Sequence, residues 1–347
     1  MRRHNLLERA QADELVNTVG NVCGVQAQVM SAALLAVGTR IDGITASDVQ
    51  RAVRQGQLVK TWAMRGTLHL LATDDLPVFT SALGETMARD ALQWMGRHGL
   101  AEKDAWSMCD AVVEGLSCGE MTRKELAQHA ASRFGSDAAQ WIDHSWGGVV
   151  KLAVFRGDVC FGPNRGRETT YMLAPDPARR SPRPAVEDAG CELLRRYLSA
   201  FAPAAPKDFR VWSGLRAPQV QRLWNRLQPE LTQVCLDGET AWALTSDTDS
   251  LANTRPNPDH VCLLPNFDCF MLGHANKEHL VSQEHYKKVY RTAGWIAPTV
   301  LVGGRVAGTW SCSAHCAISI ELFSGLSDTA SHNLAYETSR LRKFMTE

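Results

Sequence analysis

The chain repeats one pattern three times along its first 250 residues: a helix, a second short helix, a third helix and then a two-stranded ribbon. The second copy is the clearest. A helical pattern covers 104–115, and Thr122 can cap the next helix while Glu125 reaches back to it, as in a capping box. A third helix is expected over about 144–155. This order predicts several small domains in series and not one parallel sheet.

The second copy ends in a predicted β-hairpin. Its strands cover 158–162 and 169–173, and the turn between them, 163–167, is rich in Gly and Asn. Two arginines, Arg165 and Arg167, lie at the tip of this hairpin. Helix, helix, recognition helix and basic wing together are typical of a winged helix-turn-helix.

The first and third copies follow the same order. The first copy has expected helices over 10–19, 28–37 and from 45 to about 56, with ribbon strands over 58–64 and 67–71. The third has helices over 186–200, after 205–208 and from Pro218, with ribbon strands over 231–236 and 241–244. Before the third copy, the segment 174–184 holds four prolines and three arginines, which is typical of a linker.

The pattern changes after about residue 250. Short strands are expected over 261–265, 295–302, 305–311 and 317–322, with an amphipathic helix over 330–345. The fold class is therefore predicted as α+β. We expect three winged helices, at 1–100, 101–180 and 181–250, and a β-rich domain at 251–347.

Composition and charge bound the function. The 37 basic and 37 acidic residues cancel, which argues against a histone-like coat but permits a basic groove balanced by acidic faces. No run of eighteen apolar residues occurs, and the start lacks the apolar core of a signal peptide. We expect a cytoplasmic monomer that does not bind a membrane.

The ten cysteines include no C-x-x-C pair, so neither a zinc ribbon nor a redox motif is indicated. The tightest group, Cys312, His315 and Cys316, lacks a fourth ligand and a second pair. Reduced thiols without a metal or another cofactor are expected.

One stretch near the start, 22–29, carries two glutamines two residues apart. Gly24 is a plausible end of a helix, and the apolar run from Val29 indicates a new one. On an extended segment Gln26 and Gln28 point to the same side. By spacing alone they are solvated loop residues, and only the surrounding architecture favours a paired role.

Four motifs, taken together, carry a family resemblance: Gly24–Gln28, Met64–Leu70, Leu263–Asp268 and Gly304–Trp310. With them the chain resembles the AlkZ/YcaQ-like winged-helix DNA glycosylases from end to end. The resemblance implies three tandem winged helices around a concave cleft, a C-terminal β-barrel-like domain and double-stranded DNA with alkylated bases as partner.

The resemblance also implies that Gln26 and Gln28 form a catalytic Q-x-Q motif. The Q-x-Q branch is associated with bulky adducts and interstrand cross-links, whereas the other branch has a carboxylate at the second position. A neutral amide cannot take a proton from water with useful driving force, but it can orient a water and stabilise a positive sugar. Two glutamines therefore suit a cationic base such as N7-alkylguanine, which leaves neutral without a general acid.

Several other side chains are candidates. Arg65 at the first ribbon tip is either a phosphate contact or a structural salt bridge, and His69 is either near the catalytic segment or, more simply, a satisfied core histidine. Asp268 is expected to cap backbone N–H groups. The predicted DNA contacts are Asn164, Arg165, Arg167, Lys287, Lys288 and Arg305.

Two other classes of function stay open at this point. A non-enzymatic winged-helix regulator or drug sensor would carry basic residues on its third helices, yet 144–155 contains only Lys151. A small-molecule hydrolase would be expected to show a G-x-S-x-G, H-E-x-x-H or P-loop motif, and none is present.

Overall fold

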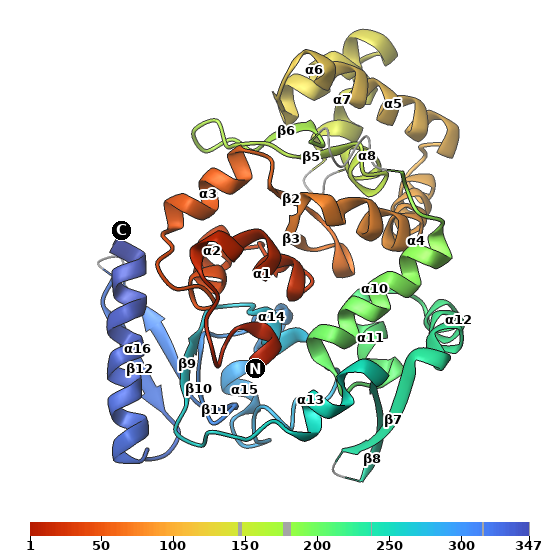
Figure 1. Ribbon diagram of the computed structural model, residues 1–347. Coiled ribbons are helices and arrows are strands. Elements are labelled where there is room, and N and C mark those ends of the chain that lie inside the picture. Colours follow the sequence, from red (N-terminus) through yellow and green to blue (C-terminus); the bar gives the residue numbers. More distant parts are fainter. Residues whose placement is uncertain (145–147, 176–181, 237, 314–315, 347) are drawn as a thin grey trace. The chain divides into compact units, whose positions relative to one another are not determined.

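The structure is a computed structural model that describes residues 1–144, 148–175, 182–236, 238–313 and 316–346. It contains two compact units (Figure 1): residues 1–52 with 194–347 form the first, and 53–193 form the second. Helices and antiparallel strands occur in both, so the predicted mixed fold class is confirmed. In the part of the chain described, none of the helices has the length and apolar character needed to cross a membrane.

The second unit is a small sheet covered by helices. Its strands are β2 (Leu58–Trp62), β3 (Leu68–Ala72), β4 (Met121–Thr122), β5 (Val159–Phe161) and β6 (Thr170–Leu173). Its α-helices are α4 (Leu76–Arg97), α5 (Glu102–Gly115), α6 (Arg123–Phe134), α7 (Ser136–Asp143) and α8 (Val150–Phe155), and 3-10 turns cover Met64–Gly66, Thr73–Asp75 and Leu116–Cys118. The strands lie in the order β3-β2-β5-β6-β4, all antiparallel.

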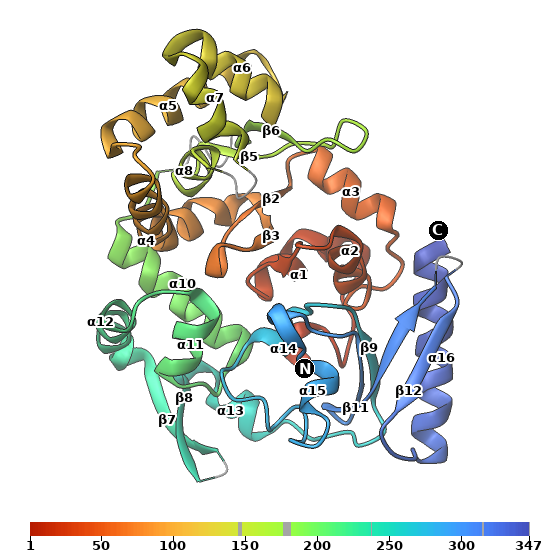
Figure 2. The same ribbon diagram turned by 180° about the vertical axis from the view of Figure 1, so that it is seen from behind.

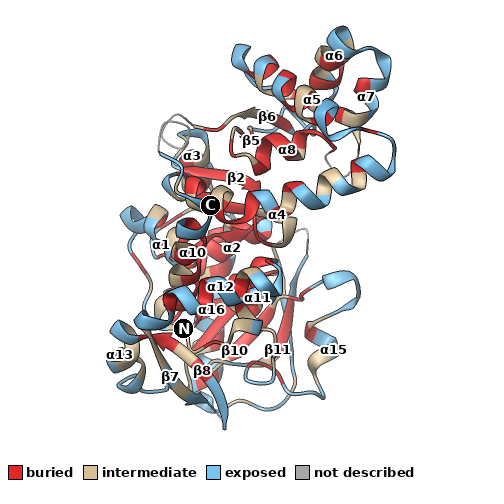
Figure 3. Ribbon diagram, turned by 90° about the vertical axis from the view of Figure 1, so that its right-hand side faces the viewer, coloured by how far each residue is buried: buried red, intermediate tan, exposed pale blue. Residues whose placement is uncertain are grey.

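The core of the second unit lies where α4, α5 and α8 pack together. Helix α8 is buried along its whole length except for Lys151, as Figure 3 shows by its colour. Gly84 lets α4 approach α8 closely, because a Cβ there would lie 2.2 Å from the carbonyl oxygen of Phe155. Close helix packing therefore depends on that one missing side chain.

The first unit is discontinuous in sequence. Its N-terminal part holds α1 (Leu15–Asn21), β1 (Val25–Gln26), α2 (Met30–Gly38) and α3 (Ala46–Arg54), which ends just beyond the unit boundary, with 3-10 turns at Arg2–His4 and Ala12–Glu14. The chain returns along α10 (Val186–Phe201), followed by α11 (Pro206–Ser213), α12 (Ala217–Leu227), the ribbon β7 (Leu231–Leu236) and β8 (Glu239–Leu244), and α13 (Thr248–Ala252), with 3-10 turns at Gln228–Glu230 and Thr245–Asp247.

The C-terminal part is a four-stranded antiparallel sheet in the order β12-β11-β10-β9. Its elements are β9 (Val261–Leu264), α14 (Cys269–Leu272), α15 (Tyr286–Val289), a 3-10 turn at Thr292–Gly294, β10 (Thr299–Val302), β11 (Arg305–Cys312), β12 (Ile318–Leu322) and α16 (Asp328–Thr346). Helix α16 packs on β9, and the two lie side by side in Figures 1 and 2. Trp310 joins strands across the sheet, since its Nε1–H donates to the Leu264 carbonyl at 2.9 Å.

Most sequence-predicted elements are present. The capping box of α6 is confirmed: the Glu125 N–H donates to Thr122 Oγ1 at 3.2 Å, and the Thr122 N–H donates to the Glu125 carboxylate at 2.7 Å. The three ribbons, the C-terminal strands and the closing helix also occur at the predicted places. The linker prediction at 174–184 falls partly outside the described residues.

One predicted helix is shorter in the structure, and one helix was missed. Of the helix expected over about 144–155, the described residues form α8 over Val150–Phe155, and residues 145–147 lie outside the described part of the chain. Gly148, just before α8, has φ +42°, a conformation outside a right-handed helix. The 22-residue helix α4 was not predicted at all.

The compact units also run across the boundaries expected at 100, 180 and 250. The reason is strand pairing: the first ribbon joins the second through Lys60 opposite Phe161, so two predicted winged helices share one sheet. The division into three winged helices and a β-barrel-like domain stays a prediction.

Candidate active site

The Q-x-Q segment lies in a sharp joint between α1 and α2. After α1, Cys23 and Gly24 both have positive φ, 58° and 86°. Their N–H groups donate to the carbonyls of Gly20 and Val19, each at 2.9 Å, which closes the end of the helix. The chain is then extended through Gln26 and enters α2 at Met30. The predicted helix stop at Gly24 is confirmed.

The two amides of this joint differ in exposure. Gln26 is 9% exposed, and Gln28 is exposed. Ala27 between them is fully buried, and Val25 before them is 1% exposed. The backbone is therefore held by packing on both sides of Gln26, while Gln28 reaches solvent. The two amides of the predicted Q-x-Q motif therefore lie in different surroundings, one buried and one at the surface.

Helix α2 is anchored by a buried ion pair. The Arg40 guanidinium donates to both carboxylate oxygens of Asp268, at 2.8 and 2.7 Å, and neither side chain is exposed. Burial opposes the charge on Arg40, but the Asp268 carboxylate raises the pKa of Arg40 above its ordinary value. Asp268 also accepts from the Phe270 N–H at 2.9 Å, so its predicted capping role is confirmed.

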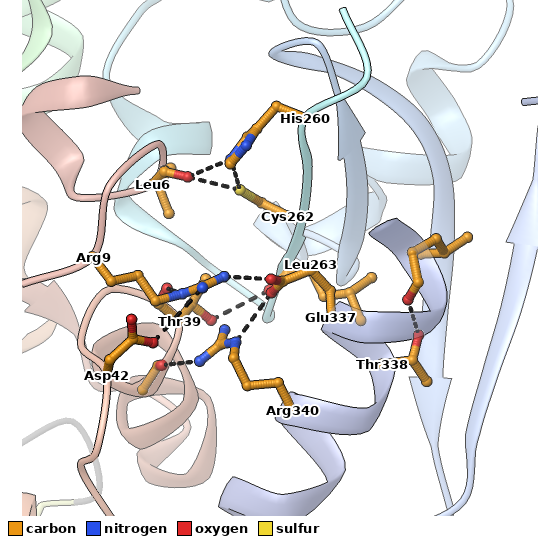
Figure 4. A network of polar contacts seen from close by, with 12 residues as sticks. Leu6, Arg9, Thr39, Asp42, His260, Cys262, Leu263, Glu337, Thr338 and Arg340 are labelled. Carbon is orange, nitrogen blue, oxygen red and sulfur yellow. Dashed lines mark hydrogen bonds and ion pairs between the residues drawn. The ribbon is translucent and has the colours of Figure 1, made fainter. Parts of the chain in front are cut away.

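A second network holds the end of α2 against α16 (Figure 4). Glu337 on α16 accepts from Arg9 at 2.5 Å and from Arg340 at 3.2 Å. The two arginines in turn donate to backbone carbonyls: Arg9 to Thr39 at 3.1 Å and Arg340 to Gly38 at 2.8 Å. The segment that carries the Q-x-Q motif is thus fixed to the C-terminal part of its unit.

Arg65 and His69 belong to the second unit. Arg65 lies at the turn between β2 and β3 with φ 59°, a conformation that is costly for a residue with a Cβ. Burial lowers the pKa of Arg65 to about 10. His69 on β3 is 2% exposed and its Nδ1 lies 2.9 Å from the Thr67 carbonyl oxygen.

The wing arginines differ from each other. The Arg165 guanidinium donates to the Glu125 carboxylate at 2.8 Å and to the Glu120 carbonyl at 3.1 Å. Arg165 is thus held by partners within its own unit. Arg167 and Asn164 are exposed, and Arg167 has no hydrogen bond or ion pair to any residue that the structure describes.

The basic residues predicted in the C-terminal part are exposed. Lys287 and Lys288 lie on α15, where Lys288 pairs with Glu321 at 3.0 Å. Arg305 begins β11 and donates to the Glu278 carbonyl at 3.1 Å. The turn beside Arg305 is packed: the Cβ position of Gly303 lies 3.1 Å from the Pro258 carbonyl oxygen.

Sequence reasoning missed one group of side chains. Lys60, Trp62, Arg123, Lys151, Phe161 and Tyr171 gather on one face of the second unit, which we call the basic–aromatic face. The alternation of Lys60 and Trp62 along β2 was the available signal. Among the described residues, no three His, Cys, Asp or Glu side chains gather as metal ligands, and His315 lies outside them.

Comparison with known proteins identifies the class. The family model of DNA glycosylase AlkZ-like proteins matches residues 19–344. The chain therefore belongs to the AlkZ-like DNA glycosylase family, which confirms the resemblance seen in the four motifs.

A curated protein and a solved structure, both from Streptomyces sahachiroi, are similar to this chain. A curated protein named interstrand DNA cross-link repair glycosylase is 35% identical over 318 residues, which cover 89% of this chain and 85% of that protein. The solved structure of the DNA glycosylase AlkZ superposes with a TM-score of 0.89 at 31% identity. That superposition covers 99% of this chain and 94% of the solved chain.

Proposed function

We propose that this protein hydrolyses the N-glycosidic bond of cationic alkylated purines in double-stranded DNA, with N7-alkylguanine as the simplest substrate. The observation that carries the proposal is the Q-x-Q joint: a buried Gln26 and an exposed Gln28 on a backbone fixed by packing and by the Arg40–Asp268 pair. Such a rigid joint provides preorganised amide dipoles and no strong base. Family membership favours this enzyme over the regulator alternative.

The chemistry follows from the charge of the lesion. The bond from the sugar C1′ to N9 breaks, its electron pair neutralises the cationic base, and positive charge develops on the sugar. A water oriented by the Gln26 or Gln28 amide oxygen attacks C1′ and loses its proton to solvent. The products are an abasic site and the neutral alkylated base.

The exposure of Gln28 is compatible with a large substrate. An amide at the rim of the site leaves room for a lesion that is not fully enclosed. The curated relative is named for interstrand cross-link repair, and for this chain we include bulky adducts and interstrand cross-links in the proposed substrate class. The corresponding physiological role is repair of alkylated DNA, or self-resistance to an alkylating agent. We propose that the protein acts in the cytoplasm as a monomer.

The proposed DNA contacts complete the site. We assign phosphate contacts to Arg167, with Asn164 beside it, and weaker ones to Arg165, whose charge Glu125 already offsets. Lys287, Lys288, Arg305 and Arg65 remain candidates for the same role, and His69 is a candidate near-site residue. We also retain the interpretation of the three helix–ribbon segments as winged helices around a cleft, with a β-barrel-like C-terminal domain.

The test uses an oligonucleotide duplex with one N7-methylguanine, followed by heat and alkali to cleave any abasic site. Gln26→Ala and Gln28→Ala should each lower single-turnover excision on the order of 10²-fold, the scale for loss of one preorganised polar group. The double variant should lose less than the product, because both amides act on one water and one sugar. Affinity for the lesion duplex should stay nearly unchanged.

Gln233→Ala is the matched control, since Gln233 is an exposed glutamine on β7 of the same unit. It should excise at the parent rate. If both Gln26→Ala and Gln28→Ala excised the base at the parent rate, the proposed role of these amides in excision would be wrong. Efficient release of uracil by the parent would contradict the requirement for a cationic base.

A further inference from the structure

Two lysines of the second unit are half-buried without a partner for their charge. Lys60 lies on β2 and Lys151 on α8. Neither has a hydrogen bond or ion pair to any residue that the structure describes. Burial lowers the pKa of Lys60, and burial together with the charge of Arg123 lowers the pKa of Lys151. Each cation has therefore lost part of its hydration without gaining an anion.

The aromatic rings of the basic–aromatic face hold the lysines in place. The Lys60 ammonium lies 5.4 Å from the ring centre of Phe161, and the Lys151 ammonium lies 5.3 Å from that of Trp62. The two rings meet edge to face at 4.7 Å. Both cations thus lie against two rings that are in contact with each other.

A third cation, Arg123, has neutral hydrogen-bond partners among the residues that the structure describes. Arg123 donates to the Tyr171 hydroxyl at 3.0 Å and to the His144 carbonyl at 3.3 Å, and its Nε–H is buried without an acceptor. Tyr171 contacts Phe161, with ring centres 5.1 Å apart, so Arg123 borders the same aromatic surface. Three positive groups on one face are accompanied by no carboxylate in these contacts.

Among the described residues, part of this face is accessible and borders a cavity. Lys151 lines a cavity of about 470 Å³ together with Trp94 and His144. Trp62 and Lys60 are both partly exposed. An anion that approached this face would meet ammonium groups already stripped of part of their water.

We infer that the basic–aromatic face is a DNA backbone site at which Lys60 and Lys151 each bind one phosphate. The inference rests on the proposed function for the identity of the anion, since the substrate of a DNA glycosylase supplies phosphates in a row. A phosphate would replace the lost hydration of each ammonium with a charge-assisted hydrogen bond. The rings between them would hold the lysines apart and keep both available to one strand.

The test measures the salt dependence of binding to an undamaged duplex by fluorescence anisotropy. Lys60→Gln and Lys151→Gln should each reduce the slope of log K against log salt by about 0.9, and the double variant by about 1.8. At 0.1 M salt each single variant should bind on the order of tenfold more weakly. Lys151→Arg, which keeps the charge, should restore the parent slope.

Lys103→Gln is the control, because Lys103 is an exposed lysine on α5 and the substitution changes the net charge equally. Its slope should stay within about 0.3 of the parent value. Slopes for Lys60→Gln and Lys151→Gln that equal the Lys103→Gln slope would overturn the inference.

A second measurement uses the unaltered protein. Acetylation followed by mass spectrometry should show that the duplex protects Lys60 and Lys151 but not Lys103. Equal modification with and without DNA would overturn the inference even if a variant failed to fold. Because neither measurement requires excision, a protein that binds as expected but releases no base would contradict only the proposed function.

Discussion

His69 shows how burial sets the charge of a side chain at the residue scale. It is 2% exposed, and burial, assisted by the charge of Arg65, lowers its pKa to about 3. The carbonyl of Thr67 opposes this shift only in part. The ring is therefore neutral throughout the range in which the enzyme would work. The expectation of a satisfied core histidine fits this environment, and a near-site role stays a prediction.

The neutral state of His69 makes stability depend on pH. Between its folded pKa of about 3 and its unfolded value of 6.5, the unfolded state binds a proton that the folded state does not. The free energy of unfolding therefore falls as pH drops through 6.5, by about 1.4 kcal/mol per pH unit. In His69→Asn the loss between pH 6.5 and 5 should be about 2 kcal/mol smaller than in the parent, measured by urea unfolding. Equal losses in both proteins would show that His69 does not titrate in this way.

Arg165 shows what a sequence cannot reveal at the same scale. A Gly-rich turn with two arginines indicates a basic tip, and both residues do lie in the exposed turn between β5 and β6. The partner of Arg165 is Glu125, which is 40 residues away along the chain. No local pattern identifies such a pair. The same holds for Lys60 and Lys151, whose significance depends on rings from other strands.

At the scale of elements, the sequence was sufficient to predict a helix or strand boundary where the residues that set this boundary lie next to it in the chain. The capping box of α6, Pro218 in the first turn of α12, and the glycines at the end of α1 and between β10 and β11 each mark a boundary. These features act within a few residues of the chain, so sequence alone predicts them. The extended Q-x-Q segment follows from the same kind of signal.

Elements shaped by distant packing were missed. Helix α4 contains Gly84, which weakens a helix locally and is explained only by its contact with Phe155 on α8. Pairing of the first ribbon with the second likewise depends on Lys60 meeting Phe161, 101 positions further along the chain by their numbers. Exposure is similarly non-local: nothing in the sequence distinguishes the buried Gln26 from the exposed Gln28.

The joint between α2 and α14 depends on one ion pair, and this can be tested. Asp268→Asn should lower the free energy of unfolding by about 3–5 kcal/mol, because the Arg40 guanidinium would be left buried without a charge partner. Urea unfolding followed by tryptophan fluorescence measures the change. The control Asp247→Asn breaks the partly exposed pair with Arg3 and should cost less than about 1 kcal/mol. A similar small cost at both positions would mean that the buried pair contributes nothing specific.

At the scale of the whole molecule, the first unit is built from the two ends of the chain and the second from its middle. The N-terminal part is held by residues from β9, α14 and α16. Loss of a contact on α16 should therefore lower the local stability of α2.

Hydrogen exchange can measure that dependence. In Glu337→Ala, amides of residues 30–42 should exchange on the order of 10²-fold faster, because Arg9 and Arg340 lose the buried carboxylate that holds them on the end of α2. Amides of the hairpin β5–β6 should keep the parent rate. Glu85→Ala, which removes an exposed pair with Arg89 on α4, is the control and should leave residues 30–42 unchanged. Parent-like exchange of residues 30–42 in Glu337→Ala would refute the dependence.

The contacts in the network of Figure 4 join residues that are synthesised at very different times. During synthesis, the stretch with Gln26 and Gln28 is made long before its partners: Glu337 follows Arg9 by 328 residues in the network of Figure 4. In the buried ion pair, Asp268 follows Arg40 by 228 residues. At about 5–20 residues per second, the longer interval lasts roughly 15–65 s. Residues 53–193 can fold during that wait, whereas the segment of the paired amides lacks these contacts until Glu337 has been made. A ribosome stalled before α16 would therefore hold a chain that carries the motif without the surroundings that position it.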